Sequence, residues 1–243
     1  MNAPSKTAIA ELTPTGKLRV GLNMSNFLLT AKDASGAPIG VAPDLGRELG
    51  KRLGVAVELV PYPNPGALAD DANKGKWDVG FLGAEPQRAA EIDFTAAYVE
   101  IESTYLVPPG SNLTKVAAVD AKGIRISVPE RSAYELWLTR NIKNAELVRI
   151  KGADNAFKQF VEGKLDALAG LRPRLITDHA NFPGSRILDG SFTAVQQAAG
   201  TPKGRPAGAQ YLREFVEDIK AAGLVAKTVE DNKVVGLTVA AAA

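Results

Sequence analysis

The sequence GKWDVGFLGAEPQRAAEIDFTAAYVE, residues 75–100, passes from an apolar run through small residues to one arginine and then to a second apolar run. Its first part, residues 77–83, has the length and apolar content of a buried strand. Pro86 then favours the start of a short helix, because proline is tolerated in a first helical turn. Arg88 has two interpretations, a surface charge paired with a nearby glutamate or a cation that receives an anionic ligand.

Similar short runs recur along the chain and alternate with amphipathic stretches. The expected strands are residues 17–22, 55–62, 77–83, 103–108, 124–129, 165–170 and 192–197. Between the first two, leucines at one-turn spacing predict a helix over residues 45–53, with Pro43 near its start and Gly54 after its end. Because strands alternate with helices, the chain is predicted to form α/β sheets that are mainly parallel and flanked by helices.

Two further helices are predicted in the second half of the chain. Asp154 is placed to cap a helix that carries Phe157 and Phe160 and ends at Gly163. An apolar stripe over residues 212–219 predicts the other. Ligands of such α/β sheets bind at the carboxyl ends of the strands, so the loops after the strands are the places to search for a site.

The chain is expected to form two lobes. The turn-rich segment PPGSNLTK, residues 108–115, interrupts the middle, and a new strand and helix rhythm then begins. The strand pattern and turn-rich stretch over residues 191–206 favour a return to the first lobe. The predicted parts are an N-terminal tail over 1–16, lobe 1 over 17–105, lobe 2 over 106–195, and a return to lobe 1 with a C-terminal tail over 196–243.

Composition excludes several functional classes. The 243 residues include no cysteine and one histidine, His179, so disulfides and thiol chemistry are excluded, and a Cys/His zinc site or a Ser-His-Asp triad would rest on His179 alone. Lysine and arginine number 29 against 27 acidic residues, with no basic run, so no nucleic-acid partner is expected. We expect no metal and no cofactor. The first residues lack a signal-peptide pattern, and no apolar stretch is long enough to span a bilayer.

The run over residues 75–100 resembles the signature of type-II (family 3) extracellular solute-binding proteins, which feed ABC importers of polar amino acids. The residues that carry the resemblance are Gly75, Trp77, Asp78, Glu85, Pro86, Gln87, Arg88, Asp93, Phe94, Thr95 and Tyr98. Further similarity in the segments GKLRVGL, GAPIGVAPDLGRELGKRLG and GKLDALAG extends it over roughly residues 17–225. The resemblance implies a type-II periplasmic-binding-protein-like fold, in which two strands cross the hinge between the lobes.

The resemblance gives Arg88 a ligand. In the family this arginine holds the carboxylate of the ligand, and a guanidinium is suited to that role because its planar fork donates two parallel hydrogen bonds. Backbone groups of the loop that begins at Gly83 are expected to assist. In lobe 2, Ser132 takes the place of a family threonine, and it either caps its helix, contacts the ligand or does both. Arg131 stands where the family favours glycine and adds a second cation or points to solvent.

Two departures from the family bear on the ligand. Leu171 occupies the position of the aspartate that binds the ligand's ammonium group, and Glu85 replaces a threonine that faces the same group. Glu85 therefore either supplies the missing carboxylate or forms a bridge to Arg88. The stretch NFLL, residues 26–29, replaces the family's Tyr-Pro-Pro-Phe at the pocket floor, so Asn26, Phe27 and Leu29 are candidates to line the pocket, although Phe27 and Leu29 also fit core positions. The residues expected to contact the ligand are Asn26, Phe27, Gly83, Glu85, Arg88, Arg131, Ser132, Ala133 and Leu171.

The sequence thus predicts a monomeric solute-binding protein that captures a small carboxylate, an amino acid or a related organic acid, in an interlobe cleft and delivers it to an ABC-type permease. The resemblance implies a periplasmic location, while the absence of a visible signal peptide leaves a cytoplasmic one open. One alternative is an enzyme similar to cyclohexadienyl dehydratases, with Glu85 as general acid. Another is the ligand-binding domain of a sensor or regulator.

Overall fold

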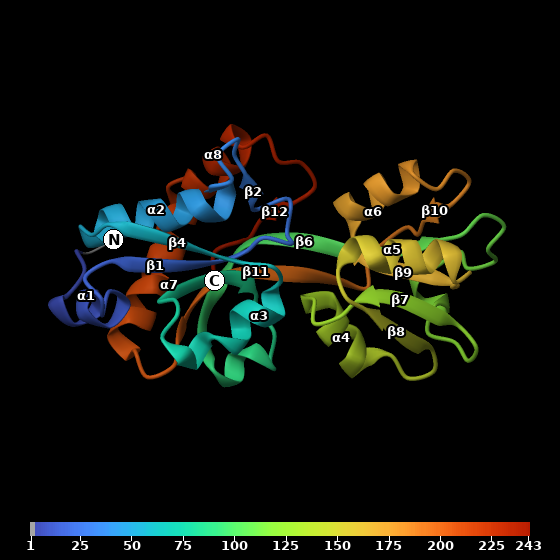
Figure 1. Ribbon diagram of the computed structural model, residues 1–243, viewed down its shortest axis with the longest axis horizontal. Coiled ribbons are helices and arrows are strands. Elements are labelled where there is room, and N and C mark those ends of the chain that lie inside the picture. The colour runs from blue at the N-terminus through green and yellow to red at the C-terminus, as the bar shows by residue number, and fades with distance from the viewer. Residues whose placement is uncertain (1–2) are drawn as a thin grey trace. The chain divides into compact units, whose positions relative to one another are not determined.

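The computed structural model describes residues 3–243, which divide into two compact units. Unit 1 comprises the chain up to Glu100 together with Gln196–Ala243, and unit 2 comprises Ile101–Val195. Two strands, β6 (Ile92–Val107) and β11 (Thr193–Pro202), run across the unit boundaries (Figure 1). The predicted α/β architecture with two boundary-crossing strands is confirmed. The first boundary falls between Glu100 and Ile101 within β6, five residues before the predicted one.

Unit 1 contains a mixed sheet in the order β4-β1-β5-β11-β6, in which β4, β1 and β5 are parallel and β11 is antiparallel to β5. Its other strands are β1 (Leu18–Asn23), β2 (Ala31–Lys32), β3 (Pro38–Ile39), β4 (Val57–Tyr62), β5 (Val79–Gly83) and β12 (Thr238–Val239). Its helices are α1 (Lys6–Leu12), α2 (Val41–Leu53), α3 (Pro65–Asp70), η1 (Ala72–Lys74), η2 (Arg88–Ala90), α7 (Pro206–Ala221) and α8 (Leu224–Asp231).

Helix α2 forms where the leucine spacing predicts it. Leu45, Leu49 and Leu53 are buried, and Gly54 ends the helix in the left-handed conformation with φ 71°. The apolar run of β5 is buried at every residue. Trp77, just before β5, is fully buried and donates its indole N–H to the carbonyl of Leu68 at 3.0 Å.

The predicted N-terminal tail is wrong over its described part. Residues Lys6–Leu12 form α1, which begins at a Ser5 cap and buries Leu12 completely. A Cβ on Gly208 of α7 would lie 2.9 Å from the Cγ of Leu12, so glycine lets the two helices approach closely. The backbone N–H of Gly208 also donates to Glu11 at 2.7 Å. These contacts join residues that are far apart in the sequence. The local pattern of residues 1–16 therefore did not predict helix α1.

The C-terminal segment is likewise attached to unit 1. Strand β12 pairs with β6, placing Val239 opposite Val99, and Ala240 donates to the carbonyl of Tyr98 at 3.1 Å. Lys220 of α7 donates to the carbonyl of Ala241 at 2.8 Å. The end of the chain therefore contributes to the sheet that carries β6.

Unit 2 has the strand order β6-β9-β7-β8, with β9, β7 and β8 parallel and β6 antiparallel to β9. Its other strands are β7 (Arg125–Pro129), β8 (Glu146–Ile150), β9 (Ala167–Leu171) and β10 (Arg186–Ile187). Its helices are η3 (Val116–Ala118), α4 (Ala133–Asn141), α5 (Ala153–Glu162) and α6 (Arg172–Ala180).

Helix α5 corrects one predicted cap. Gly152 is its N-cap residue, and Asp154 lies in the first turn, where it receives Arg174 of α6 at 2.8 Å. An acidic residue in a first turn still favours the helix through the helix dipole. The core of unit 2 includes Tyr105, whose ring lies 4.7 Å from that of Phe192.

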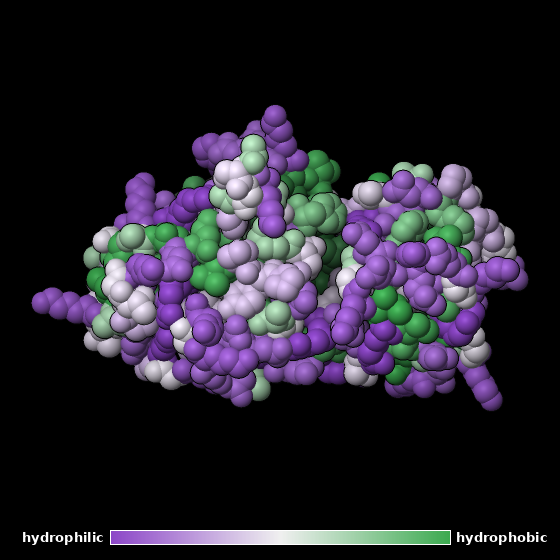
Figure 2. Space-filling model, in the orientation of Figure 1, coloured by the Kyte–Doolittle hydropathy of each residue, from purple (hydrophilic) through white to green (hydrophobic). Residues whose placement is uncertain are grey.

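The surface of each unit is mixed in character. Figure 2 shows polar residues over most of the visible face of both units, with smaller apolar patches between them. Among residues 3–243, no helix combines the length and the apolar content that crossing a membrane requires.

Candidate functional site

The carboxyl edge of the unit 1 sheet collects the residues that the sequence singled out in this unit. Strands β1 and β5 run in parallel, with Leu22 opposite Phe81, so the loops that follow them leave the sheet at the same edge. The loop after β1 carries Asn26 and Phe27. The loop after β5 begins at Gly83 and leads into η2.

Arg88 is a buried cation in this loop. It begins η2, and only 5% of its surface is exposed, which contradicts the interpretation of Arg88 as a surface charge. Its Nη1 donates to the carbonyl of Gly83 at 2.7 Å, and its backbone N–H donates to the carbonyl of Glu85 at 2.9 Å. The loop therefore folds back on itself and fixes the base of the guanidinium beside the end of β5.

Glu85 places a carboxylate in the same loop. The residue is 8% exposed, and its carbonyl accepts the backbone N–H groups of Arg88 and Ala89, both at 2.9 Å. The loop thus holds a buried guanidinium and a buried carboxyl group three residues apart. Such groups are retained inside proteins only where partners or ligands compensate their charge.

Asn26 and Phe27 differ in their surroundings. Asn26 is 6% exposed, and its side chain accepts the backbone N–H of Leu28 at 3.3 Å, so it shapes its own loop. Phe27 is 49% exposed, which makes it one of the most exposed large apolar residues described. The alternative of Phe27 as a core residue is therefore wrong, whereas Leu29 is buried at 3%.

The carboxyl edge of unit 2 brings together the predicted residues of that unit. Strands β7 and β9 are parallel, so the loop after β7 and the end of β9 share one edge. The loop after β7 carries Arg131 and leads into α4. Strand β9 ends at Leu171.

Ser132 is the N-cap residue of α4, as one of the two interpretations expected. Its hydroxyl accepts the backbone N–H of Glu135 at 3.1 Å. The first N–H groups of a helix have no intrahelical partner, so those of Ala133 and Tyr134 point out of the helix end. Arg131, just before the cap, has a positive φ of 61°, which costs a residue with a side chain about 1 kcal/mol or more. The loop thus holds a strained backbone at a helix amino terminus, an arrangement that suits an anion.

Leu171 brings no charge to its position. It is the N-cap residue of α6 and provides no side-chain cap, and it packs partly buried against the core of unit 2. It lies opposite Ser103 of β6, which is fully buried. The carboxyl end of β9 therefore carries no carboxylate at Leu171.

Two residues that contact the start of α4 or its neighbourhood, Glu135 and Arg149, are not among the predicted site residues. Glu135 is 4% exposed and accepts the backbone N–H of Arg131 at 3.1 Å, and Arg149 of β8 donates to it at 2.7 Å. The spacing of Ser132 and Glu135 is that of a capping box, which could have identified the glutamate. Arg149 gave no such signal, because the sequence analysis did not identify β8 as a strand.

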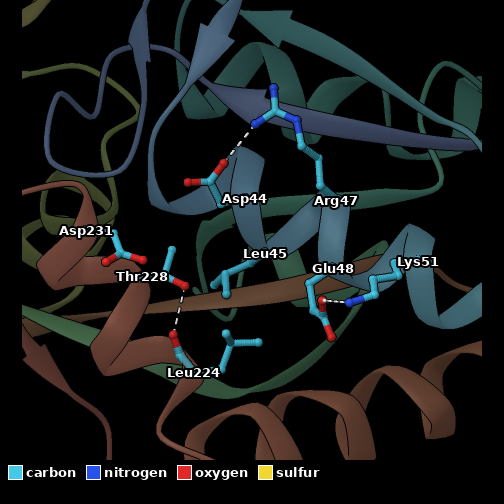
Figure 3. A pocket seen from close by; sticks show the side chains of 8 residues that line it. All are labelled: Asp44, Leu45, Arg47, Glu48, Lys51, Leu224, Thr228 and Asp231. Atoms are coloured by element: carbon cyan, nitrogen blue, oxygen red, sulfur yellow. Dashed lines mark hydrogen bonds and ion pairs between the residues drawn. The ribbon is translucent and has the colours of Figure 1, made fainter.

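A hollow on unit 1, between α2 and α8, offers a comparison with these edges (Figure 3). Its carboxylates are compensated by the protein itself. Asp44 receives Arg47 at 2.8 Å, and Lys227 donates to Asp231 at 2.7 Å. Because these pairs are local and largely exposed, the hollow provides no buried charge for a ligand. Among the described residues, no group of three or more His, Cys, Asp or Glu side chains is arranged to hold a metal ion.

Comparison with known proteins identifies the family of this chain. The model of bacterial extracellular solute-binding proteins, family 3, matches residues 18–232. The histidine-binding periplasmic protein of Salmonella typhimurium strain LT2 is 28% identical over 223 residues, which cover 87% of this chain and 85% of that protein. The L-cystine-binding protein TcyJ of Escherichia coli strain K12 is 25% identical over 154 residues, 63% of this chain and 58% of that protein.

Solved structures agree on the fold. A protein from Wolinella succinogenes DSM 1740, solved in complex with lysine, has a TM-score of 0.76 at 25% identity and covers 91% of this chain and 97% of its own. The solute receptor for L-cysteine of Neisseria gonorrhoeae has a TM-score of 0.77 at 20% identity, covering 92% of both chains. The type-II periplasmic-binding-protein fold predicted from the sequence is confirmed. The chain belongs to the bacterial extracellular solute-binding proteins, family 3, and is by function a solute-binding protein.

Proposed function

We propose that this protein captures a small carboxylate, an amino acid or a related organic acid. The observation that carries the proposal is the burial of Arg88 at the carboxyl end of β5, with its guanidinium anchored to Gly83. A buried guanidinium binds a carboxylate through two charge-assisted hydrogen bonds, and that neutralises its charge. In unit 2, the amino terminus of α4 is a second place that favours an anion.

This chain departs from its family at the residues expected to bind the amino group of the ligand. Leu171 leaves the end of β9 without a carboxylate. The only buried acid among the predicted ligand-contacting residues is Glu85, at 8% exposure. We propose that an ammonium group, where the ligand carries one, pairs with Glu85. A ligand without an amino group would instead rely on Arg88.

A screen of matched ligands tests the proposal. Each amino acid is compared with the same molecule lacking the α-amino group: L-histidine with 3-(imidazol-4-yl)propanoate, L-lysine with 6-aminohexanoate, and L-cysteine with 3-sulfanylpropanoate. A carboxylate present at a hundred times its dissociation constant stabilises the folded protein by about 2.7 kcal/mol. For a chain of this size that raises the melting temperature by roughly 5–10 °C. Differential scanning fluorimetry measures the shift.

The controls are the corresponding amines, histamine, cadaverine and cysteamine, which lack the carboxylate. We expect no shift with them. A shift of equal size with amine and acid would contradict the role of Arg88. If each amino acid and its deaminated partner give the same shift, the ligand class is a carboxylate whose amino group the site ignores, as Leu171 suggests.

We propose further that the chain works as a monomer outside the cytoplasmic membrane and delivers its ligand to the permease of an ABC-type transporter. The support is the family, whose description is extracellular, and the relatives that are named periplasmic. A crosslinking experiment with the native host's membranes tests the delivery step. Capture of an importer's permease only in the presence of the ligand is the expected result.

We propose that the protein is a binder and has no dehydratase activity. The group that an enzyme would need is a general acid, and Glu85 is the candidate. Glu85→Gln therefore separates the two functions, because the substitution keeps the shape and removes the acid. We expect Glu85→Gln to bind amino acids with an altered affinity. Neither the wild-type protein nor the variant is expected to convert the ligand, and NMR of the ligand measures conversion. Conversion by the wild-type protein that the variant loses at unchanged affinity would favour the enzyme.

A further inference from the structure

A charge pair links the first turn of α4 to β8, and the proposed ligand site does not use it directly. Glu135 is 4% exposed, whereas the side chain of its partner Arg149 is 45% exposed. The Nε of Arg149 lies 2.7 Å from Oε1 of Glu135, and its Nη2 donates to the hydroxyl of Thr139 at 2.9 Å. That hydroxyl donates in turn to Oε1 of Glu135 at 2.7 Å. The carboxylate is therefore held by a neighbouring strand and by its own helix.

The same carboxylate fixes the loop before α4. Its Oε2 accepts the backbone N–H of Arg131 at 3.1 Å, while the backbone N–H of Glu135 donates to Ser132 at 3.1 Å. Arg131 has the positive φ of 61°. A strained backbone of this kind persists only where its surroundings hold it. Glu135 thus holds the loop from one side, and Arg149 holds Glu135 from the other.

Charge explains why Arg149 is needed. A carboxylate at the amino terminus of a helix occupies the positive end of the helix dipole, where an anionic ligand would otherwise bind. Without a compensating cation, Glu135 would repel such a ligand and would also be costly to bury. Arg149 neutralises it from β8, which it reaches because β8 pairs in parallel with β7 and places Arg149 opposite Val128.

We propose that Glu135 and Arg149 are positioning residues of the ligand site. They hold the Arg131–Ala133 loop in its binding conformation. Because Arg149 neutralises the charge of Glu135, the amino terminus of α4 can still bind the carboxylate of the ligand. This inference rests on the proposed function, since it takes the loop before α4 as a carboxylate-binding element.

The test is the affinity of Arg149→Met for L-lysine and for 6-aminohexanoate, measured by isothermal titration calorimetry at a temperature where circular dichroism shows the variant folded. Because the substitution leaves the buried carboxylate of Glu135 without its cation, we expect ligand binding to weaken by at least about tenfold. Arg125→Met is the matched control. Its side chain is 44% exposed and 3.8 Å from Asp166, but that partner is itself 37% exposed, so we expect an affinity within about twofold of wild type.

A double variant separates charge from shape. In Glu135→Gln with Arg149→Met, the glutamine keeps an acceptor for the N–H of Arg131 and no buried charge remains. Removing both members of a pair is far less costly than removing one, so the affinity is expected to return to within about threefold of wild type. Arg149→Lys, which keeps the charge without the fork, is expected to retain more affinity than Arg149→Met. A double variant as weak as Arg149→Met would overturn the electrostatic part of the proposal.

Hydrogen exchange gives a readout that needs no ligand. In a peptide covering residues 130–136, amide exchange is expected to be faster in Arg149→Met than in wild type and unchanged in Arg125→Met. Unchanged exchange together with unchanged affinity would overturn the inference and leave the proposed function intact. A wild-type protein that binds none of the carboxylates would contradict the proposed function, and the exchange rates alone would then decide whether Arg149 orders this loop.

Discussion

Arg88→Ala is expected to lose at least about thirtyfold in affinity for the carboxylate ligand, because truncating one partner of a buried charge pair costs about 2–5 kcal/mol. The substitution removes the fork that binds the carboxylate and leaves the ligand's charge without a partner. Calorimetric titration with the best ligand of the screen measures the loss. The empty variant also loses the hydrogen bond to the carbonyl of Gly83, which lowers its stability by about 1–3 kcal/mol.

Two further variants make this result specific. Arg88→Lys keeps the charge but cannot donate two parallel bonds, so its affinity is expected to lie between those of the wild type and Arg88→Ala. Arg47→Ala removes an arginine whose side chain is 47% exposed and pairs locally with Asp44, and it should leave affinity unchanged. An Arg88→Ala protein that melts at a lower temperature yet binds the ligand as tightly as wild type would show that Arg88 is structural only.

Local sequence patterns predict much of this architecture. The leucines of α2 and the apolar run of β5 have a single way to bury their side chains, so their periodicity predicts their structure. A helix cap is one of the interpretations that the sequence offers for Ser132, because a hydroxyl before a helix satisfies a backbone group that has no other partner. The resemblance then indicated that Arg88 and Ser132 belong to one function, which spacing alone does not reveal.

What the sequence did not predict depends on contacts between distant segments. Helix α1 has a weak pattern of its own and is ordered by its contact with Gly208. The division of β6 between the two units leaves no local mark, because each half has the pattern of a strand. Arg149 is similar. Its importance depends on the parallel pairing of β8 with β7, which brings it to Glu135, fourteen positions away in the sequence.

Asp78 provides the second large expected effect, this time on stability. It is fully buried just before β5, and its carboxylate receives Nε and Nη2 of Arg19, both at 2.8 Å, and Nη1 of Arg205 at 3.0 Å. The hydrogen bond to Asp78 raises the pKa of Arg19. One buried carboxylate thus joins β1, β5 and the start of α7.

Asp78→Ala is expected to lower the free energy of unfolding by about 3–5 kcal/mol, because it leaves two largely buried guanidinium groups without their shared anion. Urea denaturation measures the change. Asp44→Ala, which breaks an exposed pair with Arg47, is the matched control and is expected to cost no more than about 1 kcal/mol. A loss for Asp78→Ala no larger than that of the control would contradict this role.

The position of Asp78 also predicts what the substitution leaves unchanged. Asp78 precedes β5, whereas Arg88 follows it, so the two residues lie at opposite edges of the unit 1 sheet. Ligand affinity of folded Asp78→Ala, measured well below its melting temperature, should therefore stay within about threefold of wild type, since distant sites act independently. Substitution of Arg88 would then affect mainly ligand binding, at the carboxyl edge of the sheet, and substitution of Asp78 would affect mainly stability, at the amino edge.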